Sequence, residues 1–306
     1  MAVLADVFTT YKATGNREDL TNFITDISPL ESPLYDRMGS APIKARYHEW
    51  QTDQLAAAAA NIAEEGKSFA AVARTPTNRY GNYVQNMTKE FTVSDIQNVV
   101  DKAGRANETA YQLARAAKEL KRDFEYCLFY TTIGATGGTG NTSAGPVMRN
   151  VFSWQTSCGI TSGGNAVLSA SASAVMTESD FNQGLYNIWA QGGEPNTVYV
   201  NGPLKRVISA WATSTSRVWG GDKKVTNVLS TYESDFGIFE TVLDRYVTTN
   251  MAYILDDNLY KKCSLVPVKA IPLAKRGLGQ DSMLTCSWTI EARNPSGSGF
   301  TFSSPS

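Results

Sequence analysis

The side chains that most often carry out catalysis are sparse in this chain of 306 residues. His48 is its single histidine, and the sequence contains neither a GxSxG turn nor a GxxxxGK[ST] phosphate loop. A Ser-His-Asp or Cys-His mechanism would have to be built around His48 alone. The sequence therefore predicts no catalytic residue and favours His48 as a hydrogen-bonding residue at a contact, with a Ser or Cys hydrolase as a distant alternative.

Metal and cofactor ligands are not arranged in any recognisable spacing. The four cysteines form no CxxC pair and have no second histidine beside them, which favours buried free thiols over a zinc site: Cys127, Cys158, Cys263 and Cys286. Two pairs of adjacent carboxylates lack further ligands at cation-site spacing and are typical of solvated surface: Glu64 with Glu65, and Asp256 with Asp257. The sequence predicts no metal and no cofactor.

The composition indicates a folded protein with no strong electrostatic specialisation. Hydrophobic residues make up 42% of the chain, which supports a packed core, and the net charge is −1. A dedicated nucleic-acid-binding protein is usually strongly basic. No apolar run approaches the length of a membrane span, and the N-terminus lacks the order of a signal peptide. We expect a protein that is cytoplasmic at synthesis and has no membrane partner.

Charge is distributed unevenly along the chain. Residues 1–65 hold ten acidic and five basic side chains, whereas residues 261–280 hold five basic ones and no acidic one. Such blocks can simply be solvated. They would also suit an acidic segment that lies on a basic patch of another copy, and we then expect Glu64 and Glu65 to face Lys275 and Arg276 of that copy.

The first 87 residues do not read as a compact unit. Residues 1–42 are broken by glycine and proline and predict an extended arm, with one short helix at 19–27. Residues 43–87 predict a long hairpin, with strands at 43–50 and 82–85 on either side of an alanine tract. An ordinary surface hairpin, or a short helix in the tract, is an alternative. We favour a loop that packs on a neighbouring copy and buries Trp50 there.

The remaining chain alternates helices and strands. A long helix is predicted at about 102–130, with an apolar stripe and, on another face, Arg115, Lys118 and Arg122. These three cations either make weak contacts with phosphate or form a solvated face. Residues 133–176 are rich in Gly, Ser and Thr. Residues 176–261 predict a small α/β unit that opens with Thr177 as a helix cap, and 262–293 predict two strands around a turn at 275–277.

Several of these segments resemble the major capsid proteins of tailed bacteriophages. Residues 15–20 and 27–33 are similar to the N-terminal arm of that family, residues 48–60 to its extended loop, and residues 118–125 to the core of its spine helix. A shorter match at 235–245 resembles a strand of its axial domain. The resemblance runs along nearly the whole chain.

The resemblance implies an α+β chain with the Johnson fold, which tailed-phage and herpesvirus shells share. It implies an N-terminal arm at 1–42, an extended β-hairpin loop at 43–87, a peripheral domain with the spine helix at 88–175, an axial domain at 176–261, and peripheral strands with a C-terminal tail at 262–306. The implied function is self-assembly as pentamers and hexamers into an icosahedral virion shell.

The implied partners are other copies of the chain, a portal protein, packaged double-stranded DNA, and separate scaffolding and decoration proteins. Assembly would take place in the host cytoplasm. Lys44 and Lys67 lie in the loop, but nothing marks them as activated for covalent cross-links. A nanocompartment shell of the same fold, similar to an encapsulin, is the nearest alternative.

Overall fold

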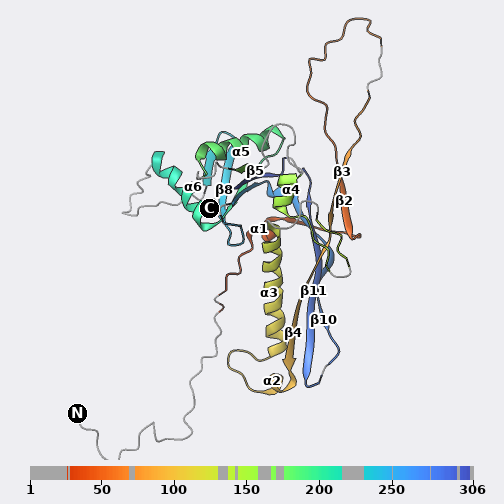
Figure 1. Cartoon of the computed structure of the whole chain (residues 1–306), viewed down its shortest axis with the longest axis vertical. Helices are drawn as coiled ribbons and strands as arrows, with labels where there is room; N and C mark the ends of the chain where they lie inside the picture. The colour runs from red at the N-terminus through yellow and green to blue at the C-terminus, as the bar shows by residue number, and fades with distance from the viewer. Residues whose placement is uncertain are drawn as a thin grey trace, which may run out of the picture.

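The computed structural model describes residues 26, 28–68, 73–129, 137–141, 144–157, 167–169, 176–215, 231–249, 251–275, 277–294 and 297–303. In these residues the chain is a mixed α+β structure, as predicted, and its named strands form three sheets (Figure 1). None of the described helices is both long enough and apolar enough to cross a membrane.

A four-stranded sheet and one long helix form the elongated part of the molecule (Figure 1). The strands run in the order β1-β10-β11-β4, and their bounds are β1 (Gly39–Pro42), β10 (Tyr260–Pro272), β11 (Gly279–Ala292) and β4 (Gln85–Ser94). The short helix α2 (Asp95–Val99) follows β4. Helix α3 (Glu108–Phe129) is the predicted spine helix and is about 33 Å long at 1.5 Å per residue.

Helix α3 packs on this sheet through residues spaced four apart. These buried apolar residues are Ala116, Leu120, Phe124 and Leu128, and the ring of Phe124 meets that of Trp288 on β11 edge-on at 5.0 Å. The helix begins six residues later than predicted. On its buried face lies Ala116, whereas the neighbouring Ala117 is exposed.

A six-stranded sheet with two helices forms the second part. Its order is β5-β12-β9-β6-β8-β7, with the bounds β5 (Val167–Ser169), β12 (Gly299–Ser303), β9 (Met251–Leu255), β6 (Thr197–Val200), β8 (Gly237–Leu243) and β7 (Thr231–Ser234). Helices α5 (Glu178–Ala190) and α6 (Gly202–Thr215) belong to this part (Figure 1). The predicted cap of α5 is confirmed, because Thr177 and Asp180 bond each other's backbone N–H groups.

The six-stranded sheet includes two strands from outside residues 176–261. These are β5 and β12, which lie in the segments predicted as peripheral. β12 is antiparallel to β9, parallel to β5, and buries Phe302 in the core beneath α5. The sequence signal failed because a five-residue strand at the end of the chain gives no indication of which sheet it pairs with.

The two parts are joined by an aromatic contact as well as by the chain itself. Phe129, the last residue of α3, lies 5.0 Å from the ring of Tyr253 on β9 and 5.9 Å from that of Tyr199 on β6. Helix α4 (Val151–Ser157) adds the fully buried Trp154 to the same core, and the one-turn helix η1 (Asp257–Leu259) joins β9 to β10. The spine helix is thereby fixed to both sheets.

The predicted loop begins as a two-stranded hairpin. Strand β2 (Tyr47–Thr52) is antiparallel to β3 (Asn78–Tyr83), in register from Tyr47 opposite Tyr83 to Thr52 opposite Asn78. Beyond the hairpin the chain projects away from the body (Figure 1). Residues 53–68 are exposed and contain no helix or strand, so the alternative of a helical alanine tract is not seen.

Most of the predicted arm, residues 1–25 and 27, including nearly all of the predicted helix at 19–27, lies outside the described residues. The last part of the arm is built into the body. Helix α1 (Pro33–Arg37) buries Leu34, and β1 runs parallel to β10 as an edge strand.

Candidate functional site

The two extended segments leave the body at two contact regions. We call the first the loop junction: His48, Trp50, Tyr80 and Asn82 of the hairpin meet Arg149, Trp154 and Glu291 of the body. We call the second the arm junction: Leu34, Tyr35 and Arg37 of α1 meet Glu125, Thr197, Glu240 and Asp257. These regions fix the direction in which the loop and the arm leave the body.

Aromatic rings hold one side of the loop junction together. Trp50 lies 5.2 Å from the buried Trp154, centroid to centroid, and Tyr80 meets Trp154 edge-on at 6.2 Å. The guanidinium of Arg149 sits 4.0 Å from the ring of Trp154. Part of Trp50, the expected anchor on a neighbouring copy, is therefore covered by its own chain, and the rest stays accessible.

A buried amide holds the other side of the loop junction. Asn82 is fully buried on β3 and donates to the carbonyl oxygens of Ile290, at 2.9 Å, and Arg149, at 3.0 Å. Its own carbonyl oxygen accepts from the backbone N–H of Arg149 at 2.7 Å. An amide satisfied on both sides fixes the hairpin to two distant segments. Sequence reasoning missed Asn82, because an asparagine inside a strand carries no signal of these partners.

His48 makes a contact within its own chain, and its expected contact with another copy stays a prediction. Its Nε2 lies 3.1 Å from Oε2 of Glu291 on β11, and Cys263 Sγ on β10 lies 3.8 Å from the same oxygen. Burial opposes ionisation of Glu291, but its hydrogen bonds with His48 and Arg293 hold its pKa below the usual value. Burial and the Glu291 charge raise the pKa of the Cys263 thiol to about 12. A thiol of this kind is a poor nucleophile at neutral pH.

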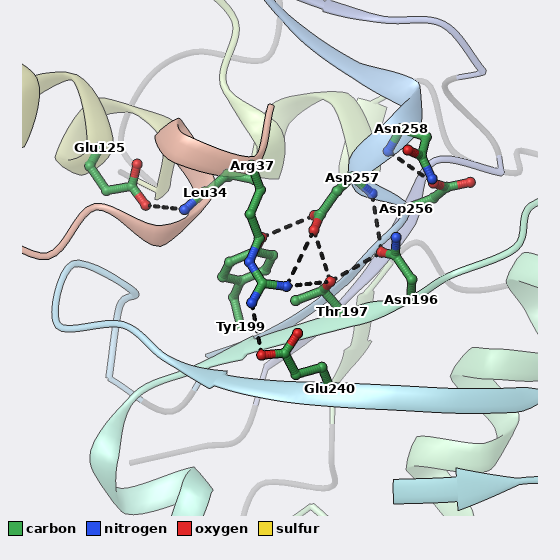
Figure 2. Close-up of polar contacts among 10 residues, drawn as sticks. All are labelled: Leu34, Arg37, Glu125, Asn196, Thr197, Tyr199, Glu240, Asp256, Asp257 and Asn258. Carbon is green, nitrogen blue, oxygen red and sulfur yellow. Dashed lines mark hydrogen bonds and ion pairs between the residues drawn. The ribbon is translucent and has the colours of Figure 1, made fainter. Parts of the chain in front are cut away.

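Arg37 is the centre of the arm junction (Figure 2). Its guanidinium lies 2.8 Å from Glu240, donates to Thr197 at 3.3 Å, and is 3.9 Å from Asp257. Asp257 also accepts from the hydroxyls of Thr197, at 2.8 Å, and Tyr199, at 3.0 Å. Burial raises the pKa of Asp257, and these donors with Arg37 oppose that shift. Asp257 is thus a structural acceptor beneath Arg37, whereas the sequence suggested a solvated pair with Asp256.

A second carboxyl from the spine helix holds the other end of α1. Glu125 accepts from the backbone N–H groups of Leu34 at 2.9 Å and Tyr35 at 2.8 Å, and Figure 2 shows the first of these bonds. Burial raises the pKa of Glu125 to about 8, and the neighbouring Asp244 adds to the shift. Burial also raises the pKa of Asp244. The two carboxyls are close enough to share a proton.

The charged residues expected at contacts between copies have different surroundings. Glu64 and Glu65 are exposed in the projecting loop. Lys275 is exposed beyond β10 and forms an ion pair with Asp95 of its own chain. Arg276 lies outside the described residues. The pairing of Glu64 and Glu65 with Lys275 and Arg276 of another copy is therefore a proposal.

The basic face of the spine helix is partly neutralised within the chain. Arg115 pairs with Glu119 at 3.0 Å, and Lys118 lies 3.6 Å from Asp26. Arg122 is half-buried. All three cations lie on α3 as predicted, but these acidic neighbours reduce the charge that they offer to another molecule.

Known proteins with similar sequences and folds are phage capsid proteins. The sequence model of the SU10 major capsid protein family matches residues 7–302. The major capsid protein of Escherichia phage Phieco32 is 24% identical over 342 residues, covering 97% of this chain and 96% of that protein.

Solved structures extend the comparison to the fold. A chain of the capsid asymmetric unit of cyanophage A-1(L) superposes with a TM-score of 0.68 at 11% identity, over 98% of this chain and 99% of that one. A capsid structure of phage G, which contains major capsid and decoration proteins, gives 0.54 at 10% identity over the full length of both chains. The Johnson fold expected from the sequence is confirmed. The chain belongs to the SU10 major capsid protein family, and it is a phage major capsid protein.

Proposed function

We propose that this capsid protein assembles as pentamers and hexamers into an icosahedral shell around double-stranded DNA, and that the projecting loop closes the contacts between copies. The supporting observation is the loop itself. Every residue from 53 to 68 is exposed, including Leu55 at 92% and Ile62 at 86% of their surface. A run of apolar side chains that the chain cannot bury by itself marks a surface for another protein.

The loop can be removed without disturbing the strands that support it. Thr52 and Asn78 already face each other in β2 and β3, so an Asn-Gly turn can replace residues 53–77. We expect this variant to fold and melt like the parent protein but to sediment as small species instead of closed shells. Electron micrographs and thermal melts measure the two properties separately, and closed shells from the shortened chain would contradict the proposal.

Substitutions in the intact loop give a matched test. Changing Leu55 and Ile62 to Ser should lower the yield of shells and leave the melting temperature unchanged, because both side chains are almost wholly exposed in the single chain. Trp50 is also proposed to contact a neighbour through its accessible part. His48 is proposed to act indirectly. Its bond to Glu291 helps to orient the loop that contacts the neighbour.

Weak contact with the packaged DNA is proposed through Arg115, Lys118 and Arg122. The side chains of Arg115 and Lys118 are 62% and 55% exposed, although both have acidic neighbours. Replacing the three with Gln should leave shell assembly unchanged and lower the salt concentration at which shells release DNA. Shells that hold protein cargo and no DNA would instead favour a nanocompartment.

The further partners follow from this shell. We propose a portal protein at one vertex and separate scaffolding and decoration proteins, the last in line with the phage G capsid, and assembly in the host cytoplasm. The shell acts by association between copies, without turnover of a substrate. Affinity capture from infected cells, followed by mass spectrometry of the shells, tests these partners.

A further inference from the structure

We propose that His48, Cys263 and Glu291 form a binding site for a zinc-like divalent metal ion that ties the base of the projecting loop to the four-stranded sheet. The three side chains come from β2, β10 and β11, far apart in sequence, and one potential ligand atom from each lies within 4.8 Å of the other two. Imidazole nitrogen, thiolate sulfur and carboxylate oxygen are the ligands that Zn²⁺ takes in proteins.

The spacing of these atoms matches a tetrahedral ion. Typical Zn–N, Zn–O and Zn–S bonds place neighbouring ligands about 3.4 Å (N to O) and about 3.6 Å (S to O) apart. Here His48 Nε2 is 3.1 Å from Glu291 Oε2, and Cys263 Sγ is 3.8 Å from the same oxygen. The third pair, His48 and Cys263, lies within 4.8 Å, so these two side chains must approach each other to share one ion. Three protein ligands leave the fourth position to water.

The register of the sheet explains why two of the ligands meet. Glu291 stands opposite Lys261 in the β10–β11 pairing, and Cys263 is two residues further along β10, so Cys263 and Glu291 are diagonal neighbours on one face. The third ligand arrives from the hairpin, which Asn82 holds to the carbonyl of Ile290, the residue before Glu291. The ligands are thus positioned by backbone pairing and by a buried amide.

The charges of the cluster suit a divalent cation. As metal ligands, the carboxylate of Glu291 and the thiolate of Cys263 carry two negative charges, which match the charge of a divalent cation. Binding replaces the thiol proton by a metal–sulfur bond and releases one proton to solvent. Arg293, which pairs with the other oxygen of Glu291 at 3.0 Å, and Lys261 oppose the cation.

The consequence for the capsid is mechanical. β2 and β3 form a separate two-stranded sheet, which is joined to β11 by side chains rather than by ladder hydrogen bonds. An ion bound to β2, β10 and β11 would set the angle at which the loop leaves the body.

The site can be tested by titrating the metal-free, full-length protein with Co²⁺, a spectroscopic substitute for Zn²⁺. We expect one equivalent to bind, with a thiolate-to-cobalt charge-transfer band that Zn²⁺ abolishes by displacement. His48→Gln and Glu291→Gln should each weaken binding by roughly tenfold or more. Cys263→Ser should remove the band.

Matched thiol variants serve as controls. Cys127→Ser and Cys286→Ser change cysteines outside the cluster, and both should bind Co²⁺ like the parent protein. His48→Gln keeps the thiol and changes only a half-buried side chain, so it stays informative if Cys263→Ser fails to fold. A parent protein without the band, or a band that survives in both His48→Gln and Cys263→Ser, would overturn the site. Because binding is measured apart from assembly, neither result bears on the shell proposal.

Discussion

At the scale of single residues, polar side chains at the two junctions differ in how much they contribute to the fold. Arg37 lies over the buried carboxylate of Asp257 and also meets Glu240, whereas Arg79 and Glu49 pair at 2.8 Å on the surface of the hairpin. Burial makes an unpaired charge costly, and solvent screens an exposed pair. Similar ion-pair distances therefore predict different effects on stability.

Arg37→Ala should lower the free energy of unfolding by about 1–3 kcal/mol, because it leaves the acceptors of Asp257 and Glu240 with fewer donors. Arg79→Ala, the matched control, should cost about 0–1 kcal/mol, since its side chain is 66% exposed. Chemical denaturation of the two variants beside the parent protein measures both. Equal losses would mean that the arm junction stabilises the fold no more than the surface pair does.

The sequence identified some of these residues and missed their partners. His48 was expected at a contact, but Cys263 and Glu291, more than 200 positions away, were not linked to it. Asn82 and Glu125 gave no signal, because their roles depend on backbone groups that only the fold brings near. The cap at Thr177 was predictable, since its partner Asp180 is three residues away.

At the scale of elements, α1 is held by a buried carboxyl of the spine helix that has an acidic neighbour. Glu125 on α3 accepts from the first backbone N–H groups of α1, and Asp244, just after β8, lies beside Glu125. One oxygen of Asp244 accepts from the N–H of Tyr246 at 2.8 Å, and the other is buried with no donor among the described residues. Protonation of Glu125 would supply that donor.

This pair gives the arm junction a pH dependence with a definite sign. The pKa of Glu125 is about 8 in the folded chain, against a usual 4.5, so the folded chain binds more protons than the unfolded chain between those values. The stability that the pair contributes is therefore full below about pH 4.5 and is lost as pH rises to about 8. Glu31, close to Asp244, acts in the same direction.

Asp244→Asn should remove most of this dependence. The new side chain keeps an oxygen for the N–H of Tyr246 and offers an amide N–H to ionised Glu125, and a hydrogen bond to a charged group contributes about 1.5–3 kcal/mol. We expect the variant to melt higher than the parent protein above pH 8 and to show little difference near pH 5. A parallel loss of stability with pH in both proteins would show that the pair does not titrate as described.

Deletions separate the arm from the elements beside it. Removing residues 1–42 takes away β1 and the fully buried Leu34, and loss of a buried leucine side chain alone costs about 2–5 kcal/mol. We expect that deletion to unfold or aggregate the chain. Deletion of residues 1–25 should preserve the melting temperature and reduce shell yield in electron micrographs. Normal shells from the shorter deletion would mean that these residues are not needed for assembly.

Whole elements, like single residues, were predictable where the signal lies close together in the sequence. Helices α3 and α5 and the strands β8 to β11 were predictable because each carries a local apolar period or a short apolar run. Sheet membership was not: β12 pairs with β9, and β1, in the predicted arm, pairs with β10. These pairings depend on contacts that local periodicity does not encode.

At the scale of the whole molecule, the structure gives Lys275 a partner that the charge distribution did not suggest. Lys275 pairs with Asp95 of its own chain, and the two side chains are 57% and 36% exposed. An exposed pair of this kind contributes about 0–1 kcal/mol to stability. Because this pair contributes little within one chain, Lys275 can affect assembly more than stability. A contact between Lys275 and the loop of a neighbouring copy would recur throughout the shell.

Charge exchange distinguishes the partner within the chain from the partner on a neighbouring copy. Changing Lys275 and Arg276 to Glu should reduce shell yield with little change in melting temperature. We expect Glu64→Lys with Glu65→Lys, added to the same chain, to restore part of the yield, because the exposed loop would carry the new cations to the neighbour. Asp95→Lys, added to the chain with Lys275→Glu and Arg276→Glu, should instead restore only the small loss of melting temperature. If Asp95→Lys recovers the shells and the loop changes do not, Lys275 acts within its own chain.

Raising the salt concentration gives an independent check. Pairs between copies should weaken as the Debye length falls from about 10 Å at 0.1 M to about 3 Å at 1 M, whereas the loop's apolar contacts should persist.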